Sequence, residues 1–101
     1  MKNKLPNIHP GEVLREEFLL PMQVSAYRLT KETGLPHSRV SDLLAGRRGV
    51  SADSALRLAR YFGTTPDFWL NLQSAYDIEE VNREYGAEIR VRVRPLELAA
   101  S

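Results

Sequence analysis

The sequence predicts an all-α fold of five helices in a single domain. Apolar residues recur three and four positions apart through most of the chain, which is the period of a helix with one buried face. A short helical pattern ends at Gly34 and another begins two residues later, which is the layout of a helix-turn-helix. With 101 residues, the chain can bury one modest core.

The first helix is expected over residues 10–20. Pro10 suits a first helical position, and Glu12 suits the first turn, where an acidic side chain is favoured. We expect Pro21 to end this helix, because the residue before a proline avoids helical geometry. The inner stripe consists of three residues: Val13, Leu14 and Phe18.

The next two helices flank Gly34, which can take a positive φ between two closely packed helices. One is expected over residues 26–33, with Ser25 as its N-cap. The other is expected over residues 36–45, where Pro36 starts it and Gly46 ends it. The inward positions are Ala26, Leu29, Thr30 and Thr33 in the former, and Val40, Leu43 and Leu44 in the latter.

The fourth helix is expected over residues 52–62, between a Ser51 cap and Gly63. The fifth starts after a Thr65 N-cap and continues as far as Tyr85. The inward positions are Ala52, Ala55, Leu56, Ala59 and Phe62 in the fourth helix, and Phe68, Trp69, Leu72, Ala75 and Tyr76 in the fifth. We expect Trp69 to be a core residue, because large aromatic side chains at helical spacing usually fill cores.

The segment 88–94 fits two patterns. Apolar and basic residues alternate, which is the period of a strand, but a single strand needs a partner, for example from a second subunit. Ile89, Val93 and Leu96 also fit one face of a helix that stops near Pro95. The helical interpretation is favoured because the rest of the chain is helical.

Charge is unevenly distributed along the chain. Residues 24–60 hold seven Lys/Arg against three acids, or +4, and residues 64–88 hold one Arg against six acids, or −5. The basic part coincides with the helix-turn-helix, as phosphate binding requires. We expect an N-terminal arm (1–8), a DNA-binding domain (9–77) and a C-terminal extension (78–101).

The chain has no Cys, no signal-peptide pattern and no apolar run of membrane-spanning length. A cytoplasmic protein is expected, associated with the nucleoid when it binds DNA. No catalytic constellation, metal-ligand spacing or phosphate-binding glycine loop is present, so neither an enzyme nor a cofactor is expected.

In a helix-turn-helix, the first residues of the second helix and one residue a turn later point at base edges. The base-contacting candidates are His37, Ser38, Ser41 and Asp42. Asp42 could accept from cytosine, or it could only repel phosphate and exclude wrong sequences. The phosphate-contacting candidates are Ser25, Tyr27, Arg28, Arg39, Arg47 and Arg48. For Arg39 a guanine contact is the alternative, whereas Arg57 and Arg60 are expected on exposed faces of a core helix.

Three segments carry a family resemblance. Residues 8–18 (IHPGEVLREEF), 49–63 (GVSADSALRLARYFG) and 64–73 (TTPDFWLNLQ) resemble, in this order, the HigA-type antitoxins of the lambda-repressor-like helix-turn-helix superfamily. The resemblance covers about residues 8–77. It implies a five-helix DNA-binding fold, a dimer, and a neighbouring toxin that is a ribosome-dependent mRNA endonuclease of the RelE-like superfamily (HigB type). That family usually has Ala where this chain has Thr30.

The resemblance predicts an antitoxin and autorepressor that binds a palindromic operator. The alternatives are a prophage-type repressor without a toxin and a protein-interaction module that no longer binds DNA. The expected dimer contacts are Tyr76, Ile78, Val81 and Tyr85. The expected toxin contacts lie in the acidic stretch, at Asp77, Glu79, Glu80 and Glu84, because RelE-like toxins are basic. The competing toxin site is the arm at residues 2–9, through Leu5, Pro6 and Ile8.

Overall fold

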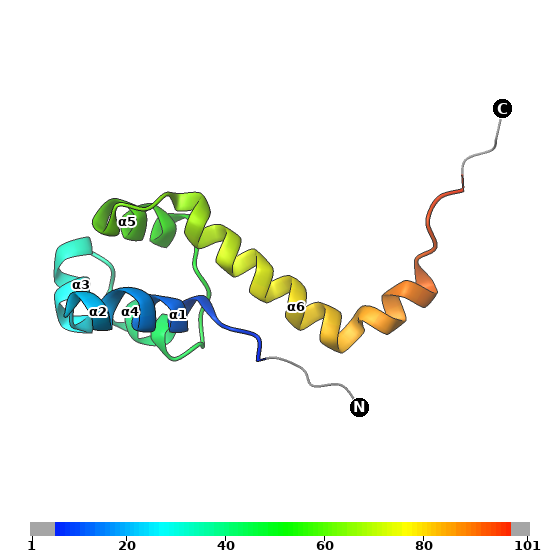
Figure 1. The fold of residues 1–101 in the computed structure, drawn as a ribbon, viewed down its shortest axis with the longest axis horizontal. Helices are drawn as coiled ribbons and strands as arrows, with labels where there is room; N and C mark the ends of the chain where they lie inside the picture. The colour runs from blue at the N-terminus through cyan, green and yellow to red at the C-terminus, as the bar shows by residue number, and fades with distance from the viewer. Residues whose placement is uncertain (1–5, 98–101) are drawn as a thin grey trace.

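The computed structural model describes residues 6–97, and all regular structure within this range is helical. The first helix is continuous and has three parts: α1 (Pro10–Val13), η1 (Leu14–Leu19) and α2 (Leu20–Met22). It is followed by α3 (Ala26–Thr33), α4 (His37–Leu44), α5 (Ala52–Phe62) and α6 (Pro66–Arg92). The shorter helices form a bundle from which α6 projects (Figure 1), and the chain measures 59 × 38 × 22 Å. The all-α fold of five helices is therefore confirmed.

The first helix does not end before Pro21 as expected; it continues to Met22. A proline inside a helix lacks an N–H, and its ring clashes with the carbonyl four residues earlier. The six residues of η1 instead have π-helical hydrogen bonding, and Leu20 N donates to Arg15 O, five residues back. This wider turn accommodates the proline ring. The helix ends at Gln23, which has a φ of +56°.

Trp69 is fully buried at the start of α6 and forms the centre of the core. The ring of Phe18 lies 5.0 Å from the Trp69 ring, that of Phe68 lies at 5.0 Å, and that of Phe62 at 6.4 Å. The indole Nε1 donates to Thr64 Oγ1 at 2.8 Å, so the polar end of the side chain is satisfied. The prediction that Trp69 is a core residue is confirmed.

The buried face of α5 differs from the expected one. Leu56 is 60% exposed and Ala52 is exposed, whereas Ser54 and Leu58 are buried beside Ala55 and Ala59. Assigning Leu56 and Ala52 to the core was therefore wrong. The true stripe is rotated by about one residue and includes Ser54, whose buried hydroxyl accepts a hydrogen bond from Ser51 Oγ. The expected inward position Ala75 on α6 is also exposed.

The segment 88–94 is not a strand. α6 continues through it to Arg92, seven residues beyond the expected end at Tyr85, and Val93 is extended. The expected domain boundary between residues 77 and 78 lies inside this continuous helix. Figure 1 shows that α6 bends in its C-terminal part. Gly86 is buried there, and a Cβ at this position would lie 2.3 Å from Asn82 Oδ1.

Candidate nucleic-acid interface

The turn between α3 and α4 is fixed by local chemistry. Ser25 Oγ accepts a hydrogen bond from Arg28 N at 3.0 Å and caps the start of α3. Gly34 ends α3 with a φ of +78°, a region that residues with a Cβ seldom adopt, and its N–H donates to Thr30 O. Pro36 is extended and becomes the N-cap of α4. These predicted signals place the second helix of the motif across the first.

The two faces of α4 differ in chemistry. Val40 and Leu43 are 1% and 2% exposed, so they anchor the helix to the core. The four base-contacting candidates lie together on the opposite side, because residues 37, 38, 41 and 42 fall within less than half a turn at 3.6 residues per turn. Three of them are exposed (His37, Ser38 and Ser41), and Asp42 is half-buried.

The four arginines expected to contact phosphates are each paired with an acid of the same chain. Arg47 Nη2 lies 3.0 Å from Asp42 Oδ1, and Arg48 Nη2 lies 4.0 Å from Asp42 Oδ2. Arg39 pairs with Asp53 at 2.8 Å, and Arg28 pairs with Glu32 at 3.1 Å. The positive charge of this region is therefore partly balanced by its own carboxylates. A phosphate would have to share or replace these contacts.

Glu32 joins α3 to α5 as well as binding Arg28. Its carboxylate accepts a short hydrogen bond from the Tyr61 hydroxyl. This bond raises the pKa of Tyr61 and lowers the pKa of Glu32, which the contact with Arg28 lowers further. Sequence reasoning missed this cluster, although the four-residue spacing of Arg28 and Glu32 is typical of a helical ion pair.

The remaining phosphate candidates lie near the N-terminus of α3. Tyr27 is 69% exposed, and Lys31 Nζ lies 5.7 Å from the centre of its ring. Ser25 is exposed, although its hydroxyl already caps the helix. Both side chains lie on the same helix as Arg28, at the end where an anion is favoured.

The turn after α4, which carries Arg47 and Arg48, is held by a side chain from α6. Gln73 Oε1 accepts a hydrogen bond from Val50 N at 2.7 Å. The Gln73 amide also fills the space beside Gly49, where a Cβ would lie 2.7 Å from it. No sequence pattern indicated this contact, because the two residues are 23 positions apart.

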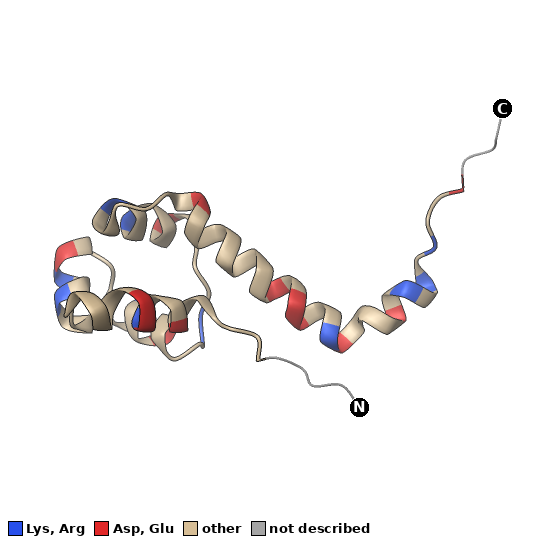
Figure 2. Cartoon of the chain, in the orientation of Figure 1, with Lys and Arg blue, Asp and Glu red and all other residues tan. Residues whose placement is uncertain are grey.

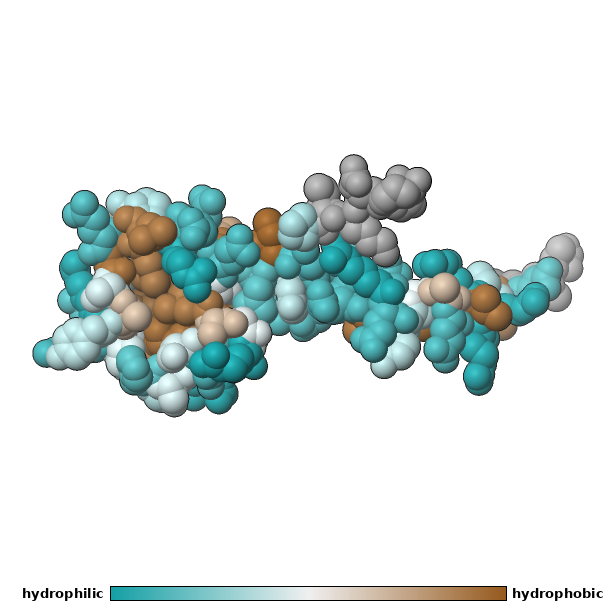
Figure 3. Space-filling model, turned by 90° about the horizontal axis from the view of Figure 1, so that it is seen from below, coloured by the Kyte–Doolittle hydropathy of each residue, from teal (hydrophilic) through white to brown (hydrophobic). Residues whose placement is uncertain are grey.

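The projecting part of α6 carries an apolar stripe. Ile78, Val81 and Tyr85 are 69%, 49% and 47% exposed and lie on one face with Ile89, which is 45% exposed. A shallow groove is lined by Asp77, Ile78, Val81, Asn82 and Ile89. On the side seen in Figure 3 the projecting part is mostly hydrophilic, with small hydrophobic patches toward its C-terminal end, and the broadest hydrophobic area lies over the bundle.

Tyr76, the remaining expected dimer contact, lies on the opposite side of α6. It is two residues from Ile78, or about half a turn away. Its ring packs against His9 with centroids 4.8 Å apart, and its carbonyl accepts from Asn7 Nδ2 at 2.9 Å. A role of Tyr76 in a dimer therefore remains a prediction.

The expected toxin contacts lie on both sides of the apolar stripe. Asp77, Glu80 and Glu84 share one flank of α6, and Glu79 lies on the other, where it pairs with Arg83 at 2.6 Å. Figure 2 shows acidic positions on the middle of α6 and basic ones toward its end. Glu80 accepts from Asn7 Nδ2 at 3.0 Å, which brings the N-terminal segment to this flank.

Of the competing arm, residues 2–5 lie outside the described part of the chain. Ile8 is 54% exposed, and His9 caps α1 by accepting from Gly11 N. Between residues 6 and 97, no group of three or more His, Asp or Glu is arranged to hold a metal ion. Over the same residues, no helix combines the length and apolar content that crossing a membrane requires.

Comparison with known proteins identifies the family. A helix-turn-helix family model matches residues 16–69. Virulence-associated protein I of Dichelobacter nodosus is 48% identical over 83 residues, which cover 82% of this chain and 77% of that protein. Antitoxin HigA-1 of Vibrio cholerae is 38% identical over 96 residues, which cover 94% and 89% of the two chains.

A solved structure has the same fold. The Pseudomonas aeruginosa antitoxin HigA, solved with the higBA promoter, is 40% identical in sequence and has a TM-score of 0.87 over 91% of this chain and 100% of that one. The chain therefore belongs to the helix-turn-helix family, in the branch of the HigA-type antitoxins.

Proposed function

We propose that this HigA-type protein is an antitoxin and transcriptional autorepressor that binds a palindromic operator as a homodimer. The observation that carries the proposal is the outer face of α4, where His37, Ser38 and Ser41 are exposed while Val40 and Leu43 anchor the helix. The similarity to an antitoxin solved with promoter DNA supports the same role for this face.

Base readout is assigned to the outer face of α4. The imidazole of His37 can donate to guanine N7 or O6, and the hydroxyls of Ser38 and Ser41 can bond several bases. Asp42 can accept from cytosine N4, provided that it releases Arg47 and Arg48 or shares its oxygens with them. Because of these ion pairs, Asp42 would have to rearrange more than the other three residues of this set in order to contact a base.

Phosphate binding is assigned to the guanidinium groups beside α4. A guanidinium has five N–H donors, and Arg39 uses one of them on Asp53. The remaining donors can bind a phosphate oxygen without breaking the ion pair. The hydroxyl groups of Ser25 and Tyr27, together with Arg28, would add contacts at the start of α3.

The homodimer is assigned to the apolar stripe of α6 formed by Ile78, Val81, Tyr85 and Ile89. Charge supports an antiparallel pairing of two such helices. Residues 77–84 hold four acids and one arginine, whereas residues 90–94 hold three arginines. A two-fold axis near Tyr85 would bring the acidic part of one α6 against the basic part of the other.

The toxin contact is assigned to the acidic flank at Asp77, Glu80 and Glu84, with Glu79 beside it. An acidic surface would steer a basic RelE-like endoribonuclease toward the antitoxin. The competing N-terminal arm meets the same flank through Asn7 and Glu80. Charge reversal and arm deletion must therefore be tested separately.

The existence of a toxin partner is tested by co-expressing this protein with the product of the adjacent short open reading frame. Co-purification, and loss of that product's mRNA cleavage, are the expected results. An adjacent product that neither binds this chain nor cleaves mRNA, together with intact promoter binding, would contradict the antitoxin role and favour a stand-alone repressor.

The assignment of the toxin contact to the acidic flank of α6 is tested by measuring the rate of toxin association at several ionic strengths. The charge-reversal variant is Glu79→Lys/Glu80→Lys/Glu84→Lys, and a matched control is Glu12→Lys/Glu16→Lys/Glu17→Lys on the first helix. A slower association with weaker salt dependence is expected only in the former. If the former is unchanged while deletion of residues 1–8 abolishes neutralisation, the arm is the toxin site.

A further inference from the structure

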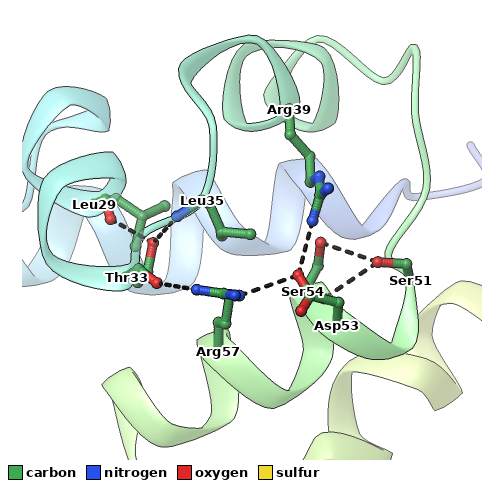
Figure 4. A network of polar contacts seen from close by, with 8 residues as sticks. All are labelled: Leu29, Thr33, Leu35, Arg39, Ser51, Asp53, Ser54 and Arg57. Carbon is green, nitrogen blue, oxygen red and sulfur yellow. Dashed lines mark hydrogen bonds and ion pairs between the residues drawn. The ribbon is translucent and has the colours of Figure 1, made fainter.

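A chain of polar contacts links both helices of the helix-turn-helix to α5 (Figure 4). Arg39 Nη1 on α4 donates to Asp53 Oδ2 at 2.8 Å, and Arg57 Nε donates to the same oxygen at 3.0 Å. Arg57 Nη1 also donates to the backbone carbonyl of Thr33, the last residue of α3, at 2.8 Å. The contacts therefore run from the end of α3, through α5, to α4.

The partial charges of helix termini stabilise Asp53 and Arg57 in these contacts. Asp53 is the second residue of α5, where a carboxylate is stabilised by the partial positive charge of the helix N-terminus. Arg57 meets a carbonyl at the C-terminus of α3, where a cation is favoured. Arg57 also lies across the turn, because a Cβ at Gly34 would be 2.9 Å from its Nη1.

The Thr33 carbonyl that receives Arg57 is itself fixed. The Thr33 hydroxyl donates to Leu29 O at 2.6 Å and accepts from Leu35 N at 3.2 Å, on the two sides of the turn. Leu35 is 1% exposed and anchors the turn in the core. The arginine therefore reaches an acceptor in a turn that is anchored to the core.

Stability alone does not explain the arrangement. The side chains of Arg39, Asp53 and Arg57 are 30%, 55% and 44% exposed. Ion pairs with this exposure contribute little to folding. The hydrogen bond from Arg57, and then that from Arg39, lower the pKa of Asp53, so the carboxylate is ionised at neutral pH. What these polar contacts do fix is the direction of the Arg39 side chain relative to α3 and α5.

We propose that Asp53 and Arg57 are positioning residues for DNA recognition, which hold the Arg39 guanidinium against a phosphate and fix the angle of α4 to α3. This role rests on the proposed function of α4 as the helix that reads DNA. Two arginines and one aspartate leave this triad a net charge of +1, so it still attracts phosphate.

Positioning and simple electrostatics predict opposite results for Asp53. Removing its charge makes the DNA-facing surface more positive, and electrostatics alone then predicts tighter binding to every duplex. Loss of positioning weakens binding to the preferred duplex, because only there must Arg39 and α4 be aligned with both backbone and bases. The ratio of the two affinities separates the two effects.

The probes are the duplex that the wild-type protein enriches from a randomised library and an unrelated duplex of equal length. Asp53→Asn removes the charge, and Arg57→Lys keeps the charge but replaces the two separate donor atoms, Nε and Nη1, with a single nitrogen. The matched control is Asp67→Asn, because Asp67 is the second residue of α6 and forms no ion pair within residues 6–97. Thermal unfolding of each variant verifies the fold.

We expect the affinity ratio to fall roughly tenfold in Asp53→Asn and in Arg57→Lys, which is within the loss caused by one mismatched base pair. It should be unchanged in Asp67→Asn. In an Arg39→Ala background, Asp53→Asn should cause no further loss. A ratio in Asp53→Asn that equals or exceeds the wild-type value would overturn the positioning role alone. A wild-type protein that enriches no duplex would overturn the proposed function, and this role with it.

Discussion

The imidazole of His9 packs edge-on against the ring of Tyr76, with centroids 4.8 Å apart. His9 precedes the first helix and caps it, and Tyr76 lies on α6, so this contact joins the N-terminal segment to the helix that projects from the bundle. Burial lowers the pKa of His9 below its ordinary value of 6.5, and the nearby Asp77 carboxylate opposes this shift.

The depressed pKa of His9 predicts a loss of stability in mild acid. As the pH falls below about 6.5, the unfolded chain takes up a proton that the folded protein does not bind. The contribution of His9 is thus complete above this pH and declines below it, toward the folded pKa. Urea unfolding at several pH values measures the decline.

His9→Asn keeps a side-chain acceptor for Gly11 N and should remove the part of the stability loss in acid that His9 causes. Asp77→Asn should enlarge it, because the group that raises the His9 pKa is lost. A decline of the same size in all three proteins would show that other groups cause it.

Replacing Thr30 is expected to give a variant with a higher free energy of unfolding than the natural protein. Its hydroxyl oxygen is buried and has no hydrogen-bond partner within the described residues. Thr30→Val removes the hydroxyl at nearly constant volume, and the free energy of unfolding should rise by about 1 kcal/mol. Chemical denaturation checks this value.

The control is Thr33→Val on the same helix, where the hydroxyl bonds Leu29 O and Leu35 N. It should lower the free energy of unfolding by about 1–3 kcal/mol, because Leu35 N loses its partner. A decrease in both variants would mean that the Thr30 hydroxyl has a partner in solution.

The apolar stripe predicts the dimer interface. Val81→Asp places a charge in the stripe and should give a folded monomer with weak operator binding, measured by analytical ultracentrifugation and DNA titration. Ala87→Asp is the matched control, because Ala87 is exposed and lies on the side of α6 opposite the stripe. A truncation that removes residues 78–101 should behave like Val81→Asp. A dimer as tight as the wild type in either form would place the interface elsewhere.

Much of the helical pattern could be predicted from the sequence, because local signals set it. The helices Ala26–Thr33 and Ala52–Phe62 begin after Ser25 and Ser51 and end at Gly34 and Gly63, as expected. Caps and left-handed glycines act within one turn, so the sequence alone specifies them.

The missed features depend on tertiary structure. A rotation of α5 by one residue exchanges Leu56 for Leu58 in the core, and both patterns fit a helical period. The segment 88–94 is a different case: its alternating pattern also matched a strand, but the favoured helical interpretation is confirmed, because α6 continues to Arg92 and no partner strand is present within residues 6–97. The acid partner of Arg39 is 14 positions away, so the recognition of Asp53 required the fold.

Salt dependence tests the phosphate contacts. If Arg39, Arg47 and Arg48 bind phosphates in both subunits, about six phosphates are neutralised, and log affinity should fall with log salt at a slope of roughly −5. Arg47→Ala should weaken binding to all sequences equally and reduce the slope. Arg60→Ala, which changes an arginine on α5, should leave the slope unchanged. Equal slopes for Arg47→Ala and the wild type would contradict the phosphate assignment.

The reading of operator DNA by α4 is tested by selection from a randomised duplex library with the wild-type protein, His37→Ala and Ser38→Ala. The wild type is expected to enrich a two-fold symmetric sequence with half-sites about one helical turn apart. Each variant should relax one base pair in both half-sites, at a cost of about 1–3 kcal/mol at that position. If both variants enrich the wild-type sequence unchanged, α4 is not the element that reads the DNA.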